Sequence, residues 1–545
     1  MKLNRYIPVL FAGLVLFSCT DMNTIVPESG TMLKQQVQET NAVIPTRATA
    51  SFSGLFSIIG QPNYFDYGTP DDFGVLMMLF CNDLESADAT ASDNNYNWFS
   101  VCGEYSSRNA NYRNPVIRYK APYAIIAAVN DFLAGFGEDE QNPESLAMMA
   151  QSRVLRAYSY MLLASDFQFN YTDHKNDLCV PICSPDVEDP ANNPRATVAE
   201  IYDIIMADLN YAVETLEGYT RSAKKFIDQQ VAYGMRARAN LNMGNYAAAA
   251  ADAEKAAAGY EPASIAEVST PSFMDLSEHN WLWGYDMTAD EAKNERYATT
   301  SSWLRSFSGW AYAAGTATYT CINKILYDKI PATDVRKGWW VDENLYSPLL
   351  DGLTWNAGDA GSASGQAIAD FTYEEKKPFV PYTNVKFGCT PLGTTDNAED
   401  MPLMRVEEMI LIQAEGYAKS GNEAKGRQIL EDFVKTYRDP SYSASASGRS
   451  LADEIWFQRR VELWGEGFAI HDTKRLNKPM VRFLGTAAST NVSPAFRFNI
   501  AANDGWLLMR FSNAELNTNF GIVDNGDGEL PKMDQNPTLR DGVTD

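Results

Sequence analysis

Histidine is scarce in this chain, and the short motifs that mark common catalytic centres are missing. The sequence has three histidines, at positions 174, 279 and 471, and no Glu-x-x-His spacing surrounds any of them. Gly-x-Ser-x-Gly, Gly-x-x-x-x-Gly-Lys and Cys-x-x-Cys do not occur either. We therefore expect no zinc site, no serine-nucleophile elbow, no phosphate loop and no dithiol redox centre.

Basic residues are also in deficit. The 45 lysines and arginines face 70 aspartates and glutamates, which gives a formal net charge of −25. Such acidity disfavours nucleic acid as a partner and disfavours attraction to anionic lipid head groups, because both demand a basic surface. A neutral sugar or a peptide remains compatible with this charge.

Long apolar runs are absent beyond the N-terminus. There, Lys2 and Arg5 precede an apolar run from Ile7 to Phe17, which Ser18 and Cys19 close. This pattern is typical of a secretory signal with a lipobox-like cysteine. The run is shorter than the roughly 20 residues that span a bilayer, which disfavours an uncleaved membrane anchor. We expect a signal peptide at 1–18, lipidation of Cys19, and a mostly polar tether over 19–49.

Six cysteines remain after Cys19, which allows 15 disulfide pairings, and the sequence does not choose among them. Cys179 and Cys183 flank Pro181 in expected extended chain, so they should lie about 13 Å apart, too far to bridge. We expect mostly buried thiols.

Helical periodicity dominates much of the remaining chain. In 151–167, apolar residues recur at 3.6-residue spacing, and Thr197 with Glu200 forms a capping-box pattern before another apolar stripe. Around Gly244 and again around Gly421, a helix rich in small residues is followed by Gly-Asn and a second helix. This is the pattern of a tetratricopeptide-type hairpin. The fold class predicted is mainly α.

Roughly 140 residues between Gly259 and Asp400 interrupt these hairpins. They are rich in Trp, Tyr, Gly and Ser and show no long helical pattern. Solenoid folds often place such insertions on the binding face.

Several motifs follow one another in the order typical of the SusD/RagB family of outer-membrane nutrient-binding lipoproteins, which the chain resembles over nearly its whole length. The matching pieces are the lipobox at Cys19, Arg153-Val-Leu-Arg-Ala-Tyr-Ser-Tyr, the helix beginning at Thr197, the Met243-Gly-Asn-Tyr hairpin, Asp334-Val-Arg336, and Arg459-Arg-Val-Glu-Leu-Trp-Gly-Glu-Gly with Asp472 and Arg475. Ala469 and His471 depart from the usual pattern, where the family often has Arg and an aromatic residue.

The resemblance implies one SusD-like domain over 50–545, with about four tetratricopeptide-like units and long irregular loops that form a ligand surface. It further implies a cell-surface lipoprotein of the outer membrane that passes a glycan to a SusC-like TonB-dependent transporter. No enzyme activity, cofactor or metal is expected. We interpret Arg460, Glu462, Glu466 and Asp472 as buried ion-pair and helix-end residues of this fold.

Aromatic residues beside amides are the expected sugar contacts, because sugar rings stack on aromatic faces while their hydroxyls bind polar side chains. In 93–100, Tyr96 and Trp98 would project to one side of an extended chain, with Asn95 beside them. The second candidate stretch, 303–319, contains Trp303, Trp310, Tyr312 and Tyr319. Four other tryptophans, in short alternating or paired runs, are interpreted as core: Trp281, Trp283, Trp339 and Trp340.

Two alternatives stay open. One is a peptide-binding lipoprotein of the RagB type, because tetratricopeptide grooves often hold extended peptides. The other is a glycoside hydrolase, whose paired carboxylates could be hidden among abundant acidic residues such as Asp71 and Asp72.

Overall fold

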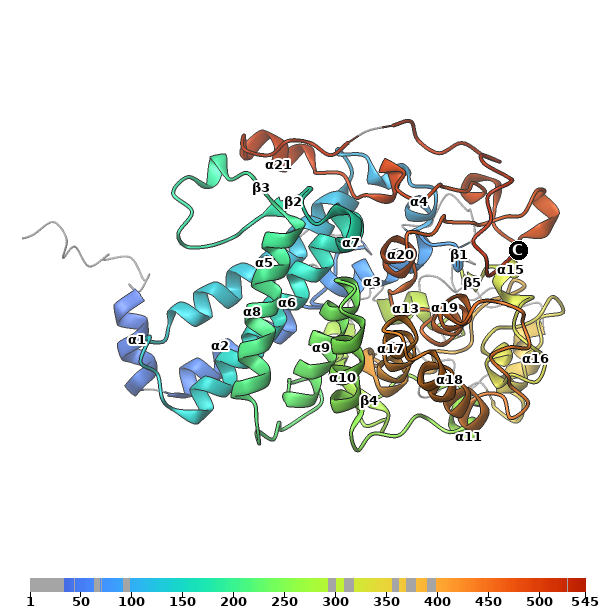
Figure 1. The fold of residues 1–545 in the computed structure, drawn as a ribbon, viewed down its shortest axis with the longest axis horizontal. Coiled ribbons are helices and arrows are strands. Elements are labelled where there is room, and N and C mark those ends of the chain that lie inside the picture. The colour runs from blue at the N-terminus through green and yellow to red at the C-terminus, as the bar shows by residue number, and fades with distance from the viewer. Residues whose placement is uncertain are drawn as a thin grey trace, which may run out of the picture.

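Helices are the dominant regular elements of the structure, a computed structural model shown in Figure 1. It describes residues 34–43, 45–62, 69, 71–91, 99–292, 300–307, 318–354, 362–368, 379–389, 398–526 and 528–545. In these ranges the strands form three antiparallel two-stranded ribbons. The predicted mainly helical class is confirmed.

Eight of the longer helices stack side by side in a row, each packed against the next (Figure 1). Their bounds are α5 (Arg113–Ala134), α6 (Pro143–Phe167), α8 (Val198–Thr215), α9 (Gln229–Asn242), α10 (Tyr246–Ala257), α17 (Val406–Lys419), α18 (Glu423–Tyr437) and α19 (Leu451–Glu462). The neighbours α10 and α17 are separated in sequence by the whole insertion. The insertion therefore leaves the stack and returns to it without interrupting the row.

Capping residues set the starts of these helices. Thr197 Oγ1 accepts a hydrogen bond from Glu200 N at 3.3 Å, and Glu200 Oε2 accepts one from Thr197 N at 2.8 Å, which confirms the capping box of α8. Asn142 caps α6, whose C-terminal part is the helix predicted over 151–167.

Glycine residues build both helical hairpins. Gly244 and Gly421 adopt φ values of +76° and +94° in the turns α9–α10 and α17–α18, as the repeated Gly-Asn pattern predicts. Gly416 on α17 allows a close approach to α10, because a Cβ atom there would lie 2.6 Å from the carbonyl oxygen of Tyr246. The two hairpins thus pack together across the point where the insertion leaves.

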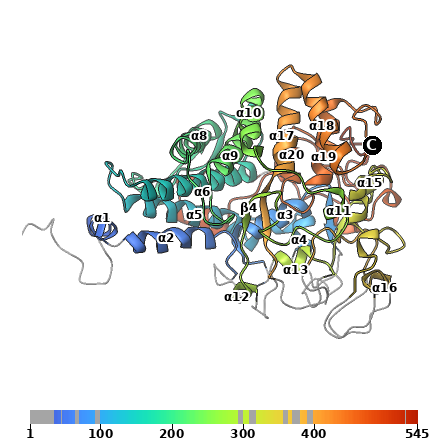
Figure 2. The ribbon, with the colours of Figure 1, turned by 90° about the horizontal axis from the view of Figure 1, so that it is seen from below.

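The insertion contains short elements, as expected. Its strand β4 (Trp281–Tyr285) pairs with β6 (Met401–Arg405), and β5 (Thr320–Ile322) pairs with β1 (Ala89–Ala91). Figure 2 shows α12, α13 and α16 along the edge opposite the ends of α10 and α18. The helices described in the insertion are α11 (Ile265–Val268), α12 (Ala289–Ala292), α13 (Thr300–Leu304), α15 (Lys324–Tyr327) and α16 (Ala363–Ile368). The four tryptophans interpreted as core are all buried, at 0–1% exposure.

The remaining elements complete the frame. They are α1 (Lys34–Val43), α2 (Pro45–Ser57), α3 (Gly74–Leu84), α4 (Ser100–Gly103), α7 (Tyr171–His174), α20 (Ala469–Arg475) and α21 (Asn513–Thr518), with the ribbon of β2 (Leu178–Pro181) and β3 (Arg195–Thr197). None of the helices in the described ranges is long and apolar enough to cross a membrane. Of the six cysteines after Cys19, five are buried and Cys183 is half-buried.

The N-terminal helices differ from the predicted tether over 19–49. Residues 34–43 and 45–57 are helical, and α1 binds the end of α5. Gln38 Nε2 donates hydrogen bonds to the carbonyl oxygens of Ala134 and Phe136, each at 3.0 Å. Asn41 Nδ2 donates to Gly135 O at 3.1 Å. The part of the predicted tether from Lys34 onward is therefore docked structure, because its amides pair with carbonyls that a helix end leaves free.

Candidate functional site

An aromatic anchor cluster joins the described flanks of both predicted ligand segments. It comprises Phe80, Phe99, Trp303, Phe307, Tyr319 and Phe379, all 1–4% exposed. The rings of Phe99 and Trp303 lie 4.6 Å apart, and Phe379 lies 5.1 Å from Tyr319 and 6.4 Å from Phe307. These residues come from four distant parts of the chain and share one core.

The predicted ligand residues Asn95, Tyr96, Trp98, Trp310 and Tyr312 lie outside the described residues. The described residues next to their segments nevertheless lie together. Ala91 pairs with Thr320 across the β1–β5 ribbon, and the far ends of the segments are Phe99 and Phe307 in the anchor cluster. Segments 92–98 and 308–317 therefore start and end at neighbouring points of the scaffold.

Trp303 requires a correction. It was predicted as an exposed sugar contact, but it is 1% exposed and packs edge-on against Phe99, with Phe80 at 6.3 Å. A buried ring presents no face to a sugar, and the same holds for Tyr319 of this stretch, which is 1% exposed. We therefore assign Trp303 to the packing that holds the two segments together.

A buried ionic cluster lies beside this region. It contains four cations, Lys386, Arg336, Arg405 and Arg438, and four carboxylates, Asp334, Glu407, Glu462 and Glu466, so its formal charges balance. Every side chain in it is at most 4% exposed. The burial expected for the family motif is thus confirmed for Glu462 and Glu466.

Burial and the neighbouring charges shift the pKa values of these groups in opposite directions. Burial alone would raise the pKa of Glu462, but the nearby guanidiniums of Arg438, Arg405 and Arg336 outweigh it and hold that pKa below its usual range. Burial lowers the pKa of Lys386 to about 8, although the Glu466 carboxylate opposes this shift. Lys386 Nζ donates to Glu466 Oε1 at 2.8 Å and to the carbonyl oxygens of Glu462 and Trp464.

The family motif that begins at Arg459 also binds Asp88, which precedes segment 92–98 in the chain. Arg460 Nη2 binds Asp88 Oδ1 at 2.6 Å, and Trp464 Nε1 donates to Asp88 O at 3.0 Å. Asp88 directly precedes β1. Arg460 also binds Asp541, while Asp472 on α20 binds Arg459, so both act as the buried ion-pair residues that the sequence predicted.

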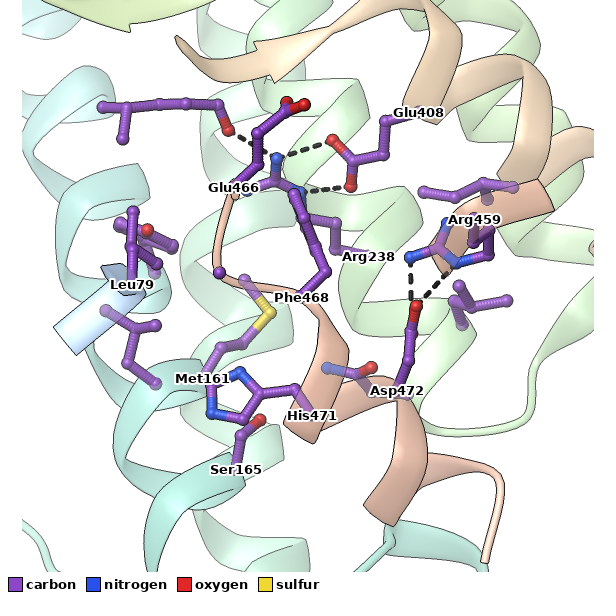
Figure 3. Close-up of a pocket in the computed structure, with 17 residues that line it drawn as sticks. Leu79, Met161, Ser165, Arg238, Glu408, Arg459, Glu466, Phe468, His471 and Asp472 are labelled. Carbon is purple, nitrogen blue, oxygen red and sulfur yellow. Dashed lines mark hydrogen bonds and ion pairs between the residues drawn. The ribbon is translucent and has the colours of Figure 1, made fainter. Parts of the chain in front are cut away.

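A cavity of about 80 Å³ lies where α6, α9, α17, α19 and α20 meet (Figure 3). Figure 3 shows the ion pair Arg238–Glu408 above Phe468 and the ion pair Arg459–Asp472 to its right. This volume is below the 300–1,000 Å³ typical of ligand sites but admits several waters. Arg459 Nη1 has no hydrogen-bond partner there, which a water would supply. We interpret the cavity as a small space between packed helices that can hold water.

A larger open groove of about 520 Å³ runs between α5, the end of β2 and α21. Tyr119 and Tyr123 line it with rings 4.6 Å apart. Tyr119 Oη donates to Glu515 Oε1 at 3.0 Å, and Tyr123 Oη donates to Pro181 O at 2.5 Å. Sequence reasoning missed this groove, although the i, i+4 spacing of the tyrosines on one helix face is a readable signal. Its hydroxyls are already paired within the protein.

The possible metal-ligating side chains among the described residues are those of His, Cys, Asp and Glu. In the ranges that the structure describes, no group of three or more His, Cys, Asp or Glu could hold a metal ion. His471, which lines the 80 Å³ cavity, binds Asp166 Oδ1 through Nε2 at 2.9 Å.

Comparison with known proteins identifies the family to which this fold belongs. A family model described as "Starch-binding associating with outer membrane" matches residues 76–241, and one described as "SusD family" matches residues 287–537. No curated protein matches the sequence.

Solved structures share the fold at low identity. A SusD-like carbohydrate binding protein from Bacteroides vulgatus has 20% identity and a TM-score of 0.70, with 89% of this chain and 98% of that chain covered. A SusD superfamily protein from Bacteroides thetaiotaomicron has 20% identity and a TM-score of 0.66, with coverages of 88% and 99%. A laminarin binding SusD-like protein has 18% identity and a TM-score of 0.62, with coverages of 89% and 99%. Since the two family models together span most of the chain, the protein belongs to the SusD/RagB family.

Proposed function

We propose that the protein is a lipoprotein, anchored through Cys19 at the surface of the outer membrane, that captures an oligo- or polysaccharide. It then passes the glycan to a SusC-like TonB-dependent transporter without cleaving it. The observation that carries the proposal is the convergence, on one anchor cluster, of two aromatic-bearing segments, the first of which also carries amides. Family membership and a relative that binds laminarin support the choice of a glycan.

Segments 92–98 and 308–317 carry the proposed ligand contacts. Asn95, Tyr96 and Trp98 belong to the first, and Trp310 and Tyr312 to the second. Their flanks meet at Ala91–Thr320 and Phe99–Trp303, so residues from both can reach one ligand. Aromatic rings stack on sugar faces and amides bind hydroxyl groups, which is the pairing a glycan site requires.

A glycan array probed with the lipid-free protein, with peptides included, tests the ligand class. We expect binding to a glycan and none to peptides. Binding to peptides alone would replace this proposal by the RagB-type alternative. Release of shorter products during the assay would instead favour a glycoside hydrolase.

Single substitutions then test the site. Stacking on one ring should contribute about 1–3 kcal/mol, by analogy with bases on aromatic side chains. We therefore expect Trp98→Ala and Trp310→Ala to weaken binding by roughly 5- to 150-fold. The matched control is Phe520→Ala, which removes an aromatic side chain that is 77% exposed on the C-terminal segment. Equal affinities for all four proteins would refute the assignment.

The transporter partner is tested separately in a native host. A tagged protein extracted gently from outer membranes should co-purify with a SusC-like TonB-dependent transporter. If the tagged protein is recovered without a transporter but still binds glycan, the proposed transfer step is wrong and the proposed capture of glycan remains.

A further inference from the structure

Two cysteines from different elements meet in the core next to β1. Cys81 on α3 and Cys102 on α4 are 1% and 3% exposed, and their Sγ atoms lie 3.3 Å apart. A disulfide bond measures about 2.05 Å, so the sulfurs need to approach by only about 1.3 Å.

The surroundings favour contact between these two sulfurs. Cys81 Sγ also lies 3.2 Å from Met77 Sδ, which forms no bond with a thiol under mild oxidation. Cys102 Sγ accepts weak hydrogen bonds from Ser107 Oγ at 3.8 Å and from Asn114 Nδ2 at 3.7 Å. A disulfide sulfur retains lone pairs, so both contacts persist after oxidation.

We propose that Cys81 and Cys102 form an intramolecular disulfide in the exported protein. The proposal rests on the export that forms part of the proposed function, because disulfides persist outside the reducing cytoplasm. The oxidant is the disulfide of a thiol–disulfide oxidase. One cysteine thiolate attacks it to form a mixed disulfide, and the second thiolate displaces the carrier. The two thiol protons and two electrons pass to the carrier, which leaves as a dithiol.

Oxidation takes place before the core closes. Burial raises the pKa of Cys81 well above its usual value, so the thiolate that must attack is scarce in the folded protein. The bond ties α3 to α4 at the two ends of the chain that carries β1 and the candidate segment 92–98. It therefore restrains the scaffold on both sides of that segment.

The test counts reactive thiols in the full-length lipoprotein, extracted from membranes and denatured in an alkylating reagent. We expect four labelled cysteines without reductant, namely 179, 183, 321 and 389, and six after reduction. Peptide mapping without reductant should recover Cys81 linked to Cys102. Six labels without reductant, or a link from Cys81 to another cysteine, would overturn the proposal.

Matched variants separate the bond from the loss of a buried thiol. Cys81→Ala should raise the unreduced count to five, because it frees Cys102, whereas the control Cys179→Ala should lower it to three. Reductant should lower the melting temperature of the parent by about 3 °C and leave that of Cys81→Ala unchanged. The same melting shift in both would argue against the bond. These readouts do not involve glycan, so failure of glycan binding leaves the disulfide result intact, and the converse also holds.

Discussion

The charge balance of the buried ionic cluster makes Glu462 the residue whose neutralisation should cost most. Glu462 is fully buried, and Arg438 approaches it through Nε and Nη2, each at 2.8 Å. Arg336 and Arg405 lie at 3.2 and 3.3 Å. Glu462→Gln keeps the shape of the side chain but leaves four cations against three carboxylates. Breaking a buried ion pair from one side costs about 3–5 kcal/mol, because an uncompensated charge stays buried.

This free-energy cost can be converted to a shift in melting temperature, because the entropy of unfolding scales with chain length. At about 2.1 cal/mol/K per residue, unfolding 545 residues has an entropy of about 1.1 kcal/mol/K. A loss of 3–5 kcal/mol should therefore lower the melting temperature by about 3–5 °C, measured by circular dichroism or calorimetry. The control is Glu529→Gln, which removes one partner of an exposed pair with Lys532 and should leave the melting temperature unchanged.

The pH dependence gives a second readout. The pKa of Glu462 is lowered in the folded protein, whereas an unfolded glutamate has a pKa of about 4.3. Its contribution to stability is therefore present above about pH 4.3 and is lost as the pH falls below that value. The melting temperatures of parent and Glu462→Gln should converge in acid. A variant that melts within 1 °C of the parent at pH 7, or a constant gap down to pH 3, would refute the reasoning.

Further predictions address the scaffold and the anchor. Gly54→Ala in α2 should stabilise the protein by about 0.5–1 kcal/mol in urea unfolding, because a Cβ there meets nothing within 4 Å and alanine favours the helix. Gly416→Ala should destabilise it by about 1–3 kcal/mol in the same assay, since its Cβ would clash with Tyr246 O; equal midpoints for the two variants would contradict the close packing of α10 on α17. Thr197→Ala should cost about 1 kcal/mol through loss of the α8 cap, and an unchanged urea midpoint would argue against that cap. Cys19→Ala should abolish incorporation of a labelled fatty acid and release the protein from membranes; retained label would place the lipid elsewhere.

Local signals in the sequence predicted the helices well. The α8 cap is a four-residue pattern, and the hairpin turns need a left-handed glycine at one position, so both can be read without knowing the fold. The docking of α1 could not be read in this way. Its contacts are amides of Gln38 and Asn41 on carbonyls at the end of α5, about 95 residues away, and it has no apolar stripe that would predict burial.

The error at Trp303 has a related cause. Serine and glycine around it resemble an exposed loop, but its neighbours Phe80 and Phe99 come from a part of the chain about 200 residues earlier. The composition of a segment describes only residues that are adjacent in sequence, whereas the burial of a side chain depends on residues distant in sequence that pack against it. The extents of the domain and the identities of the ligand contacts stay predictions, because composition alone proposes Trp98 and Trp310.

The scaffold and the candidate segments should respond differently to mutation. Asp88, bound by Arg460 and Trp464, fixes the start of β1, and the anchor cluster fixes the described ends of segments 92–98 and 308–317. These contacts are buried and mutually satisfied, so changing them alters the stability of the whole frame. We propose that residues of the two segments, such as Trp98 and Trp310, act on the ligand instead. Substitutions in the anchors should therefore act on ligand binding through unfolding, and substitutions in the segments should change affinity at constant melting temperature.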